Sequence, residues 1–207
     1  MIFALAADGG SDRALMPILD WSLKRAGLTK VSGRWVDFSR IPHRRGTTEQ
    51  LQAAIELYPC DILFIHRDAE GEALQTRQSE IEKLVRPLPI RHVPVIPVRM
   101  TEAWMLAYPA AIRKAAGNPN GDAPLNLPDV RKLEQLPNPK SVLHKALTLA
   151  SGRNARRRTV FPVHRRVHLV PQYTEDFSPL DVLPAFQAMQ HHIAEAVAAL
   201  DLAAQDA

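Results

Sequence analysis

Acidic side chains follow two apolar runs of the chain, and their types and spacing suit the binding of a divalent cation. Asp8 and Asp12 come after the first run, and Asp68 and Glu70 come after the run that ends at His66. Residues i and i+2 of an extended segment point to the same side, so Asp68 and Glu70 are expected to converge. Carboxylate oxygens suit Mg²⁺ or Mn²⁺, and a cation held in this way stabilises the transition state of phosphodiester cleavage.

Each of these acids also has a purely structural interpretation. Acidic side chains are common in turns and at helix N-termini, where they cap the helix and suit its dipole. For Asp12 the capping interpretation is preferred. For Asp8, which opens an Asp-Gly-Gly turn, the two interpretations are balanced. For Asp68 with Glu70, which follow the most apolar run of the chain, metal binding is favoured.

The elements that must position these acids follow from the hydrophobic pattern. Apolar runs and helical periodicity alternate along the first 117 residues, which predicts a mostly parallel α/β sheet flanked by helices. Such sheets bind ligands outside the carboxyl ends of their strands, where the acids fall. The fourth strand contains two prolines and is expected at a sheet edge. We expect strands over 2–7, 34–38, 61–66 and 92–98, and one helix from Thr101 to the stop at Gly117.

The remaining residues predict a helical C-terminal extension. Residues 118–139 are rich in Pro and Asn, and Asn138-Pro139 has the chemistry of an N-cap and first helical residue. Ser178-Pro179 is expected to begin the last helix, whose apolar stripe would pack back on the sheet. The core is therefore assigned to residues 1–117 and the extension, packed on that core, to residues 118–207.

The net charge of +4 is unevenly distributed. Residues 151–170 hold six arginines and no acid, whereas residues 171–207 hold six acids and neither Lys nor Arg. The arginines suit contacts to a phosphate backbone, although the acidic tail offers them an alternative partner. Arg67 and Lys140 are further candidate phosphate contacts. Alternatively, Arg67 pairs with an acid and Lys140 is an ordinary solvated lysine. The arginines are Arg153, Arg156, Arg157, Arg158, Arg165 and Arg166.

Composition and motifs exclude several classes. The chain is 46% hydrophobic and 23% charged, which is typical of a globular protein and not of a disordered one. No apolar stretch is long enough to span a membrane, no signal peptide is evident, and the single Cys60 cannot form an internal disulfide. We therefore expect a soluble cytoplasmic protein with no membrane partner. The P-loop, nucleophile elbow and Cys-x-x-Cys motifs are missing, so ATPase, serine hydrolase and zinc-ribbon functions lack support.

Several stretches, in their order and spacing, resemble the Toprim domain of topoisomerases, primases and the overcoming-lysogenisation-defect nucleases. The wider sequence resembles prokaryotic Toprim-like proteins associated with mobile-element or defence functions. The stretches extend over most of the chain and are DGGSDRALMPIL, DILFIHRDAEG, VPVIPVRMTEAWMLA, NPKSVLHKAL and FSPLDVLPAFQ. The resemblance implies a Toprim-like, Rossmann-like sheet.

The resemblance also implies a set of site residues. The family's first acid, which binds metal and acts in general acid–base catalysis, maps to Asp8, and its Asp-x-Asp pair maps to Asp68 and Glu70. These three residues would hold Mg²⁺ or Mn²⁺. Glu102, in the stretch Thr-Glu-Ala-Trp, resembles a further acid of these proteins that would complete the site. Its alternative role is that of a first-turn glutamate favoured by the helix dipole.

The leading hypothesis is a Mg²⁺-dependent nuclease acting on DNA or RNA, as an effector of defence against phages or mobile elements. One departure motivates an alternative: Asp8 stands where the family usually has Glu, which shortens that side chain by one bond of about 1.5 Å. The alternative is a catalytically degenerate subunit that binds nucleic acid or an ATPase partner. A phosphotransfer or nucleotide-binding α/β domain is a third interpretation, and the sequence leaves homo-oligomerisation open.

Overall fold

The computed structural model describes residues 1–7, 9–41, 47–152 and 161–205, and its centre is a four-stranded sheet in which all strands are parallel. The strand order is β2-β1-β3-β4, so β2 lies on one side of β1, and β3 and then β4 lie on the other side. The predicted α/β class, with a parallel sheet flanked by helices, is confirmed. The strands are β1 (Ile2–Ala6), β2 (Ser32–Trp35), β3 (Ile62–His66) and β4 (Arg91–Val95).

The two edge strands differ in how well the sequence predicts them. β4 lies at the edge, as predicted, although it ends at Val95, so that Pro94 lies in the strand, paired with Ile65 of β3, and Pro97 lies beyond it. β2 begins at Ser32, two residues before the expected start at Arg34, because this edge strand is largely exposed and has no buried apolar run. A side chain at Gly33 would collide with the ring of Phe3, so a close approach of neighbouring side chains fixes glycine there.

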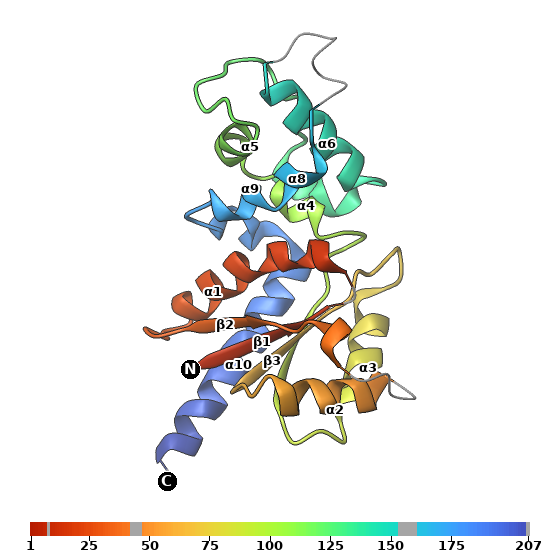
Figure 1. Ribbon diagram of the computed structural model, residues 1–207, viewed down its shortest axis with the longest axis vertical. Helices are drawn as coiled ribbons and strands as arrows, with labels where there is room; N and C mark the ends of the chain where they lie inside the picture. The colour runs from red at the N-terminus through yellow and green to blue at the C-terminus, as the bar shows by residue number, and fades with distance from the viewer. Residues whose placement is uncertain (8, 42–46, 153–160, 206–207) are drawn as a thin grey trace.

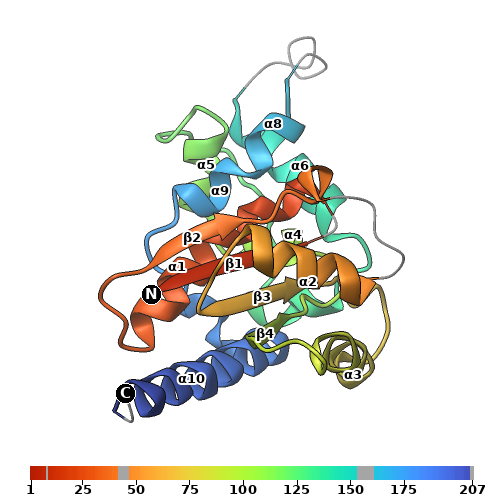
Figure 2. The same ribbon diagram turned by 60° about the horizontal axis from the view of Figure 1, so that its bottom comes forward.

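Alternate residues of the central strands face two separate cores. Phe3 and Phe64 face the side covered by α1 (Met16–Arg25) and α10 (Pro184–Gln205), and the intervening Ala4 and Leu63 face the opposite side. That second side is covered by α2 (Thr47–Leu57) and α3 (Leu74–Val85). Figure 2 shows the sheet between these two helical layers, with α10 alongside β4.

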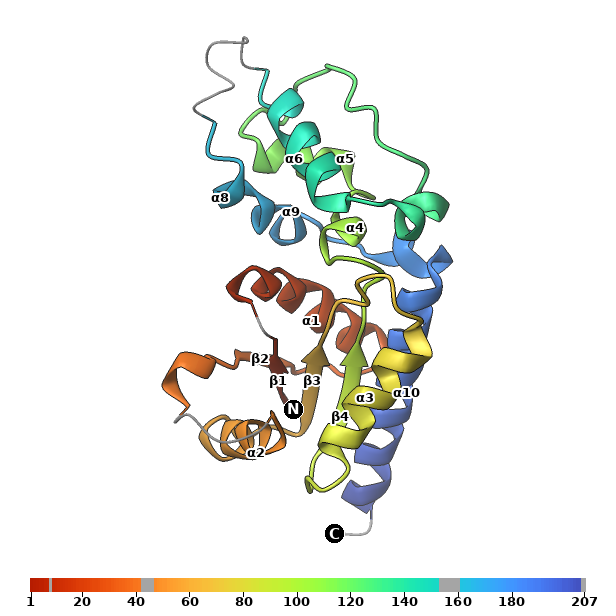
Figure 3. The ribbon, with the colours of Figure 1, turned by 90° about the vertical axis from the view of Figure 1, so that its right-hand side faces the viewer.

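Within the described residues, five short helices form a separate group at one end of the sheet, which we call the helical cap (Figure 1). Figure 3 shows the arrowheads of β3 and β4 pointing toward this group, so the cap covers the carboxyl ends of the strands. The helices are α4 (Glu102–Met105), α5 (Pro109–Ala115), α6 (Pro139–Ala150), α8 (His164–Val167) and α9 (Leu169–Gln172).

Prolines account for two differences from the expected helices. The single helix predicted from Thr101 to Gly117 is wrong, because it is divided into α4 and α5 and Pro109 takes the start of α5, where its missing N–H costs nothing. The last helix begins at Pro184 rather than at Ser178, since residues 178–182 form a separate 3₁₀ helix, η4. By contrast, the cap at Asn138 is confirmed: its side chain accepts a hydrogen bond from Ser141 N at 2.9 Å.

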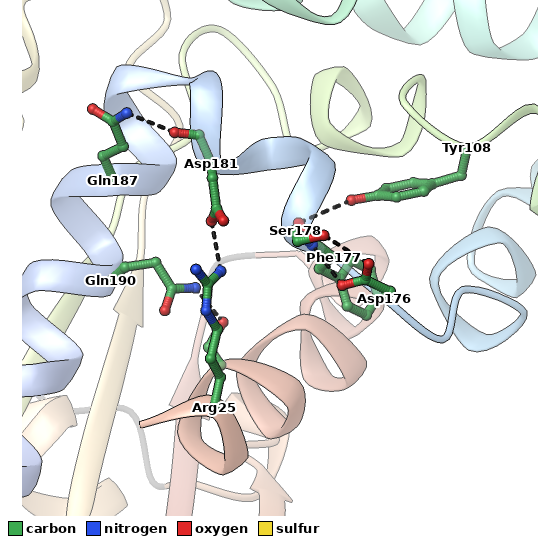
Figure 4. Close-up of polar contacts among 9 residues, drawn as sticks. Arg25, Tyr108, Asp176, Phe177, Ser178, Asp181, Gln187 and Gln190 are labelled. Carbon is green, nitrogen blue, oxygen red and sulfur yellow. Dashed lines mark hydrogen bonds and ion pairs between the residues drawn. The ribbon is translucent and has the colours of Figure 1, made fainter. Parts of the chain in front are cut away.

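Polar contacts connect α1, the segment that follows α4 and the segment that leads into α10 (Figure 4). Arg25 at the end of α1 pairs with Asp181 of η4 at 2.7 Å, and Tyr108 donates to the carbonyl of Phe177 at 3.4 Å. In space, α5, which precedes the expected boundary at residue 117, packs against α6, which follows it. Helix α10 returns to the sheet and packs against β4. Among the described residues, no helix combines the length and apolar character needed to cross a membrane.

Candidate functional site

The candidate site lies at the carboxyl ends of β1 and β3, where the strand order reverses direction. Open parallel sheets bind their ligands at this point because the loops that leave the two neighbouring strands diverge there. The 3₁₀ helix η1 (Gly10–Leu15) supplies Asp12 after β1, and Asp68 follows two residues after the end of β3. Neighbouring strands thus place two carboxylates at one edge of the sheet.

Asp68 is the residue on which the negative charge of the site converges. Its Oδ1 is buried and accepts no hydrogen bond from any described residue. Burial is the largest cause of a raised pKa at Asp68, followed by the nearby carboxylates of Asp12, Glu102 and Glu70 in that order. Together, and against the opposing Thr101 backbone, they raise the pKa to about 7. A carboxyl group in these surroundings binds either a proton or a cation.

His66 is oriented toward these acids by the neighbouring strand. Its Nδ1 lies 3.1 Å from the carbonyl oxygen of Val95, and because a carbonyl only accepts, Nδ1 carries the hydrogen. Its Nε2 then faces Asp68 Oδ1 at 3.5 Å, Asp12 Oδ1 at 3.7 Å and Thr101 Oγ1 at 3.4 Å. The buried imidazole therefore presents either a lone pair or a proton to the acids.

Glu70 is turned away from the position that the extended spacing predicts. It adopts a left-handed backbone with φ 53°, followed by Gly71 at φ 96°, so residues 68–70 are not extended. Its side chain is 74% exposed and lies 3.6 Å from Arg77, which also pairs with Glu80 at 2.8 Å. Glu70 lines the same pocket as Asp68 and raises the pKa of that residue, although the structure directs its carboxylate to Arg77.

The helical cap contributes Glu102 and Lys140 to the same region. Glu102 is 8% exposed at the start of α4, and its charge raises the pKa of Asp68. Lys140, in the first turn of α6, places its Nζ 3.7 Å from Glu102 Oε1. Thr101 forms no side-chain cap on α4, and its hydroxyl faces His66 instead. Lys140 of the helical cap therefore balances part of the negative charge of the acids around Asp68.

The remaining predicted site residues fall in different places. Arg67 lines the pocket and lies 4.0 Å from Glu80, and Arg166 donates to the carbonyl of Ala115 at 3.4 Å. Neither Arg165 nor Arg166 pairs with an acid of the described part of the tail, where Asp181 pairs with Arg25 and Glu195 lies beside His191 and His192. Asp8, Arg153, Arg156, Arg157 and Arg158 lie outside the described residues.

Three of the acids line a polar pocket of about 250 Å³, which we call the acidic site. Its lining residues are Asp12, Asp68 and Glu70, with His66, Arg67 and Arg77. Within the described ranges, no three His, Cys, Asp or Glu side chains are grouped closely enough to hold a metal ion by themselves. Mg²⁺ keeps several of its waters and is bound through only one or two carboxylates. The unpartnered Oδ1 of Asp68 and the surplus of carboxylates fit such an ion in donor type and in charge.

Sequence reasoning underrated four residues of this site. The capping interpretation of Asp12 is confirmed, since its Oδ2 accepts from Gly9 N at 3.1 Å, and its Oδ1 also lies 3.7 Å from His66 Nε2 in the candidate site. The available signal was its position four residues after Asp8, at the end of the first strand. For His66, Thr101 and Arg77, no local pattern separates a site residue from an ordinary polar one.

Comparisons with family models, with curated proteins and with solved structures give no match to the chain. The resemblance to Toprim-like proteins, with the functions that it implies, therefore stays a prediction. The site must be interpreted from its own geometry, which is a group of carboxylates at a strand switch point under a basic helical cap.

Proposed function

We propose that this protein is a Mg²⁺- or Mn²⁺-dependent nuclease that hydrolyses phosphodiester bonds of nucleic acid with a Toprim-like site. The observation that carries the proposal is the environment of Asp68, whose carboxyl group is partly buried among three other acids at the switch point of the sheet. Uncompensated negative charge of this kind costs stability, and a divalent cation removes that cost while it binds a phosphate.

Asp68 and Asp12 are the described residues that would hold the cation, and Glu70 would join them after leaving Arg77. Asp8 is assigned to the same group only by the Toprim resemblance. A bound Mg²⁺ would activate a water molecule and stabilise the charge of the leaving oxygen. Carboxylates with a water-rich cation are the usual site for engaging a phosphate.

The other residues have roles that follow from their charges and positions. His66 Nε2 lies among the carboxylates, where it can hold a proton that is released or consumed during hydrolysis. Lys140 is half-exposed and lies beside Glu102, so its ammonium group can reach a phosphate that enters from solvent. Arg67 lines the pocket and offers a second cationic contact. These cations position the phosphate and do not distinguish between bases.

The experiment is a cleavage assay with plasmid DNA, single-stranded DNA and RNA in Mg²⁺ or Mn²⁺. Asp68→Asn is compared with Asp20→Asn, which removes one negative charge from α1, at a residue that pairs with Lys24. We expect loss of cleavage on the order of 10²-fold or more for Asp68→Asn and parent-like activity for Asp20→Asn. An Asp68→Asn protein that cleaves as well as the parent would show that the proposed mechanism is wrong.

One observation favours a second function, in which the site is catalytically degenerate and the protein binds nucleic acid or an ATPase partner. The carboxylate of Glu70 is paired with Arg77, and no group of three donors is preassembled within the described ranges. Under this alternative, Mn²⁺ binding is absent from the parent, while binding of nucleic acid persists. Calorimetry with Mn²⁺ therefore separates the two functions without depending on the choice of substrate.

A further inference from the structure

A second cavity, of about 640 Å³, lies between η1 and the cap helices α8 and α9. We call it the basic pocket. η1 contributes Ser11 and Arg13, and the cap contributes His164, His168 and Gln172. Among the described residues that line it none is acidic, and apolar side chains complete its wall. Hydrogen-bonding groups, cationic groups and apolar surface therefore meet in one cavity.

The arginine and the two histidines of the basic pocket are available to a ligand. Arg13, His164 and His168 are exposed, and among the described residues none of the three forms an ion pair. The charge of Arg13 makes the smallest contribution to the lowered pKa of Asp37, which is set mainly by hydrogen bonds from Ser39. Arg13 thus has no fixed acidic partner within the described parts of the chain.

The basic pocket is next to the acidic site along η1. Ser11 and Arg13 line the basic pocket, while Asp12, which lies between them in the sequence, lines the acidic site and faces His66. Successive residues of a 3₁₀ helix point in directions about 120° apart, since three residues complete one turn. A single turn of backbone therefore separates the two cavities.

A second, independent series of contacts joins the two cavities through the cap. The ring of His164 packs edge-on against the ring of His144, with centroids 4.7 Å apart. His144 lies one turn after Lys140 on α6, and Lys140 pairs with Glu102 beside Asp68. A series of side-chain contacts thus leads from Glu102, beside Asp68, to the basic pocket.

We infer that the basic pocket receives one nucleotide of an unpaired nucleic-acid strand, next to the phosphodiester that the acidic site would cleave. This inference rests on the proposed function. The volume lies within the range of about 300–1,000 Å³ that is typical of sites for small organic ligands. A single nucleotide has this size, whereas a base within a duplex is stacked and must leave the helix to enter such a pocket.

The lining of the basic pocket suits each part of a nucleotide. Arg13 offers a planar guanidinium to the phosphate, and guanidinium–phosphate pairs can form two parallel hydrogen bonds. His164 and His168 offer imidazole rings, which stack on bases. Ser11 and Gln172 offer hydrogen bonds to the sugar or to a base edge. The acidic site next to it would then engage the following phosphate.

The test measures binding without metal, in EDTA, by fluorescence anisotropy of labelled oligothymidylate, oligouridylate and a duplex containing the same strand. Arg13→Gln is compared with Arg131→Gln, which removes the same charge from an exposed residue of the 3₁₀ helix Val130–Gln135. We expect Arg13→Gln to weaken binding of the single strand roughly tenfold, since a charge-assisted contact is lost. Arg131→Gln is expected to change it less than about twofold.

A second pair of variants, His168→Asn and the exposed His191→Asn on α10, should reproduce this contrast. The duplex should bind more weakly than the single strand and respond equally to Arg13→Gln and Arg131→Gln. Equal affinity for duplex and single strand, or equal effects of the pocket and control variants on the single strand, would overturn the inference. If Asp68→Asn abolishes cleavage while these contrasts are absent, the pocket assignment fails and the proposed function stands. If the contrasts appear in a protein that cleaves no nucleic acid, the pocket assignment stands and the proposed function fails.

Discussion

His66 places its Nε2 3.5 Å from Asp68 Oδ1 while its Nδ1 contacts the carbonyl oxygen of Val95 at 3.1 Å. The strand next to β3 therefore sets the orientation of the imidazole, and the carboxylate beside it is the one with the strongly raised pKa. Without metal, the raised pKa of Asp68 favours a proton on this carboxyl group. A cation that binds Asp68 displaces that proton.

Two substitutions of His66 separate its structural contact from its chemistry. The amide nitrogen of Asn can replace Nδ1 at Val95, whereas the amide of Gln extends to the position of Nε2. His66→Asn is expected to keep a parent-like melting temperature and to lose activity on the order of 10²-fold, as for a missing acid–base group. His66→Gln should unfold at a lower temperature, because the carbonyl of Val95 then keeps its hydrogen bond from Arg67 N but loses the one from the side chain at position 66. Melting curves and cleavage rates are measured together, and equal activity of His66→Asn and parent would contradict a chemical role for Nε2.

The raised pKa of Asp68 makes the metal-free protein less stable as the pH rises. The pKa is 3.8 for an ordinary Asp and about 7 in the folded protein, so between these values the folded state holds a proton that the unfolded state has released. Stability from this group is present below the lower value and is lost as the pH rises toward the higher one. Asp68→Asn removes the penalty and should raise the free energy of unfolding near pH 8 by on the order of 1–2 kcal/mol. Melting in EDTA measures this, with Asp20→Asn as the control. An effect that does not shrink toward pH 5 would contradict it.

Metal binding should release a proton below neutral pH. Because Asp68 must lose its proton to bind a cation, the affinity for Mn²⁺ should rise about tenfold between pH 6 and pH 8, for a pKa of about 7. Calorimetry in two buffers with different ionisation enthalpies counts the released protons. An affinity that is constant over this range would show that Asp68 is not a ligand.

Lys140 should act on substrate binding, and its removal should also lower stability, because Glu102 then loses its cationic partner. Lys140→Met removes the cation beside Glu102, and its loss should raise KM roughly tenfold, because a contact to phosphate is missing. Lys145→Met, also on α6 and exposed, is the matched control and should behave like the parent. Equal KM values for the two variants would place Lys140 outside the substrate path.

The parallel sheet could be predicted because β1 and β3 are continuous apolar runs, which is the pattern of strands buried on both faces. Their order could not be read from the sequence, although Asp12 and Asp68 do lie beyond the carboxyl ends of these two strands. β2 was misplaced because an exposed edge strand carries no hydrophobic signal. Pro109 and Pro184 mark the starts of α5 and α10, which the hydrophobic periodicity alone did not predict.

The candidate site depends on contacts that local sequence does not encode. Glu102 lies near Asp68 only because the cap folds over the ends of the strands, and the role of His66 depends on a carbonyl group from another strand. The direction of Glu70 follows from a left-handed backbone at that residue, which the extended spacing of Asp68 and Glu70 did not indicate. The acid types and strand ends were therefore predictable, whereas their grouping was not.

The measurement that tests the central claim most directly is calorimetric titration of the metal-free protein with Mn²⁺ at about pH 8, above the pKa of Asp68. We expect binding by the parent, parent-like binding by Asp20→Asn and no detectable binding by Asp68→Asn. Binding by Asp68→Asn that equals the parent's, or no binding by the parent, would contradict a metal site centred on Asp68.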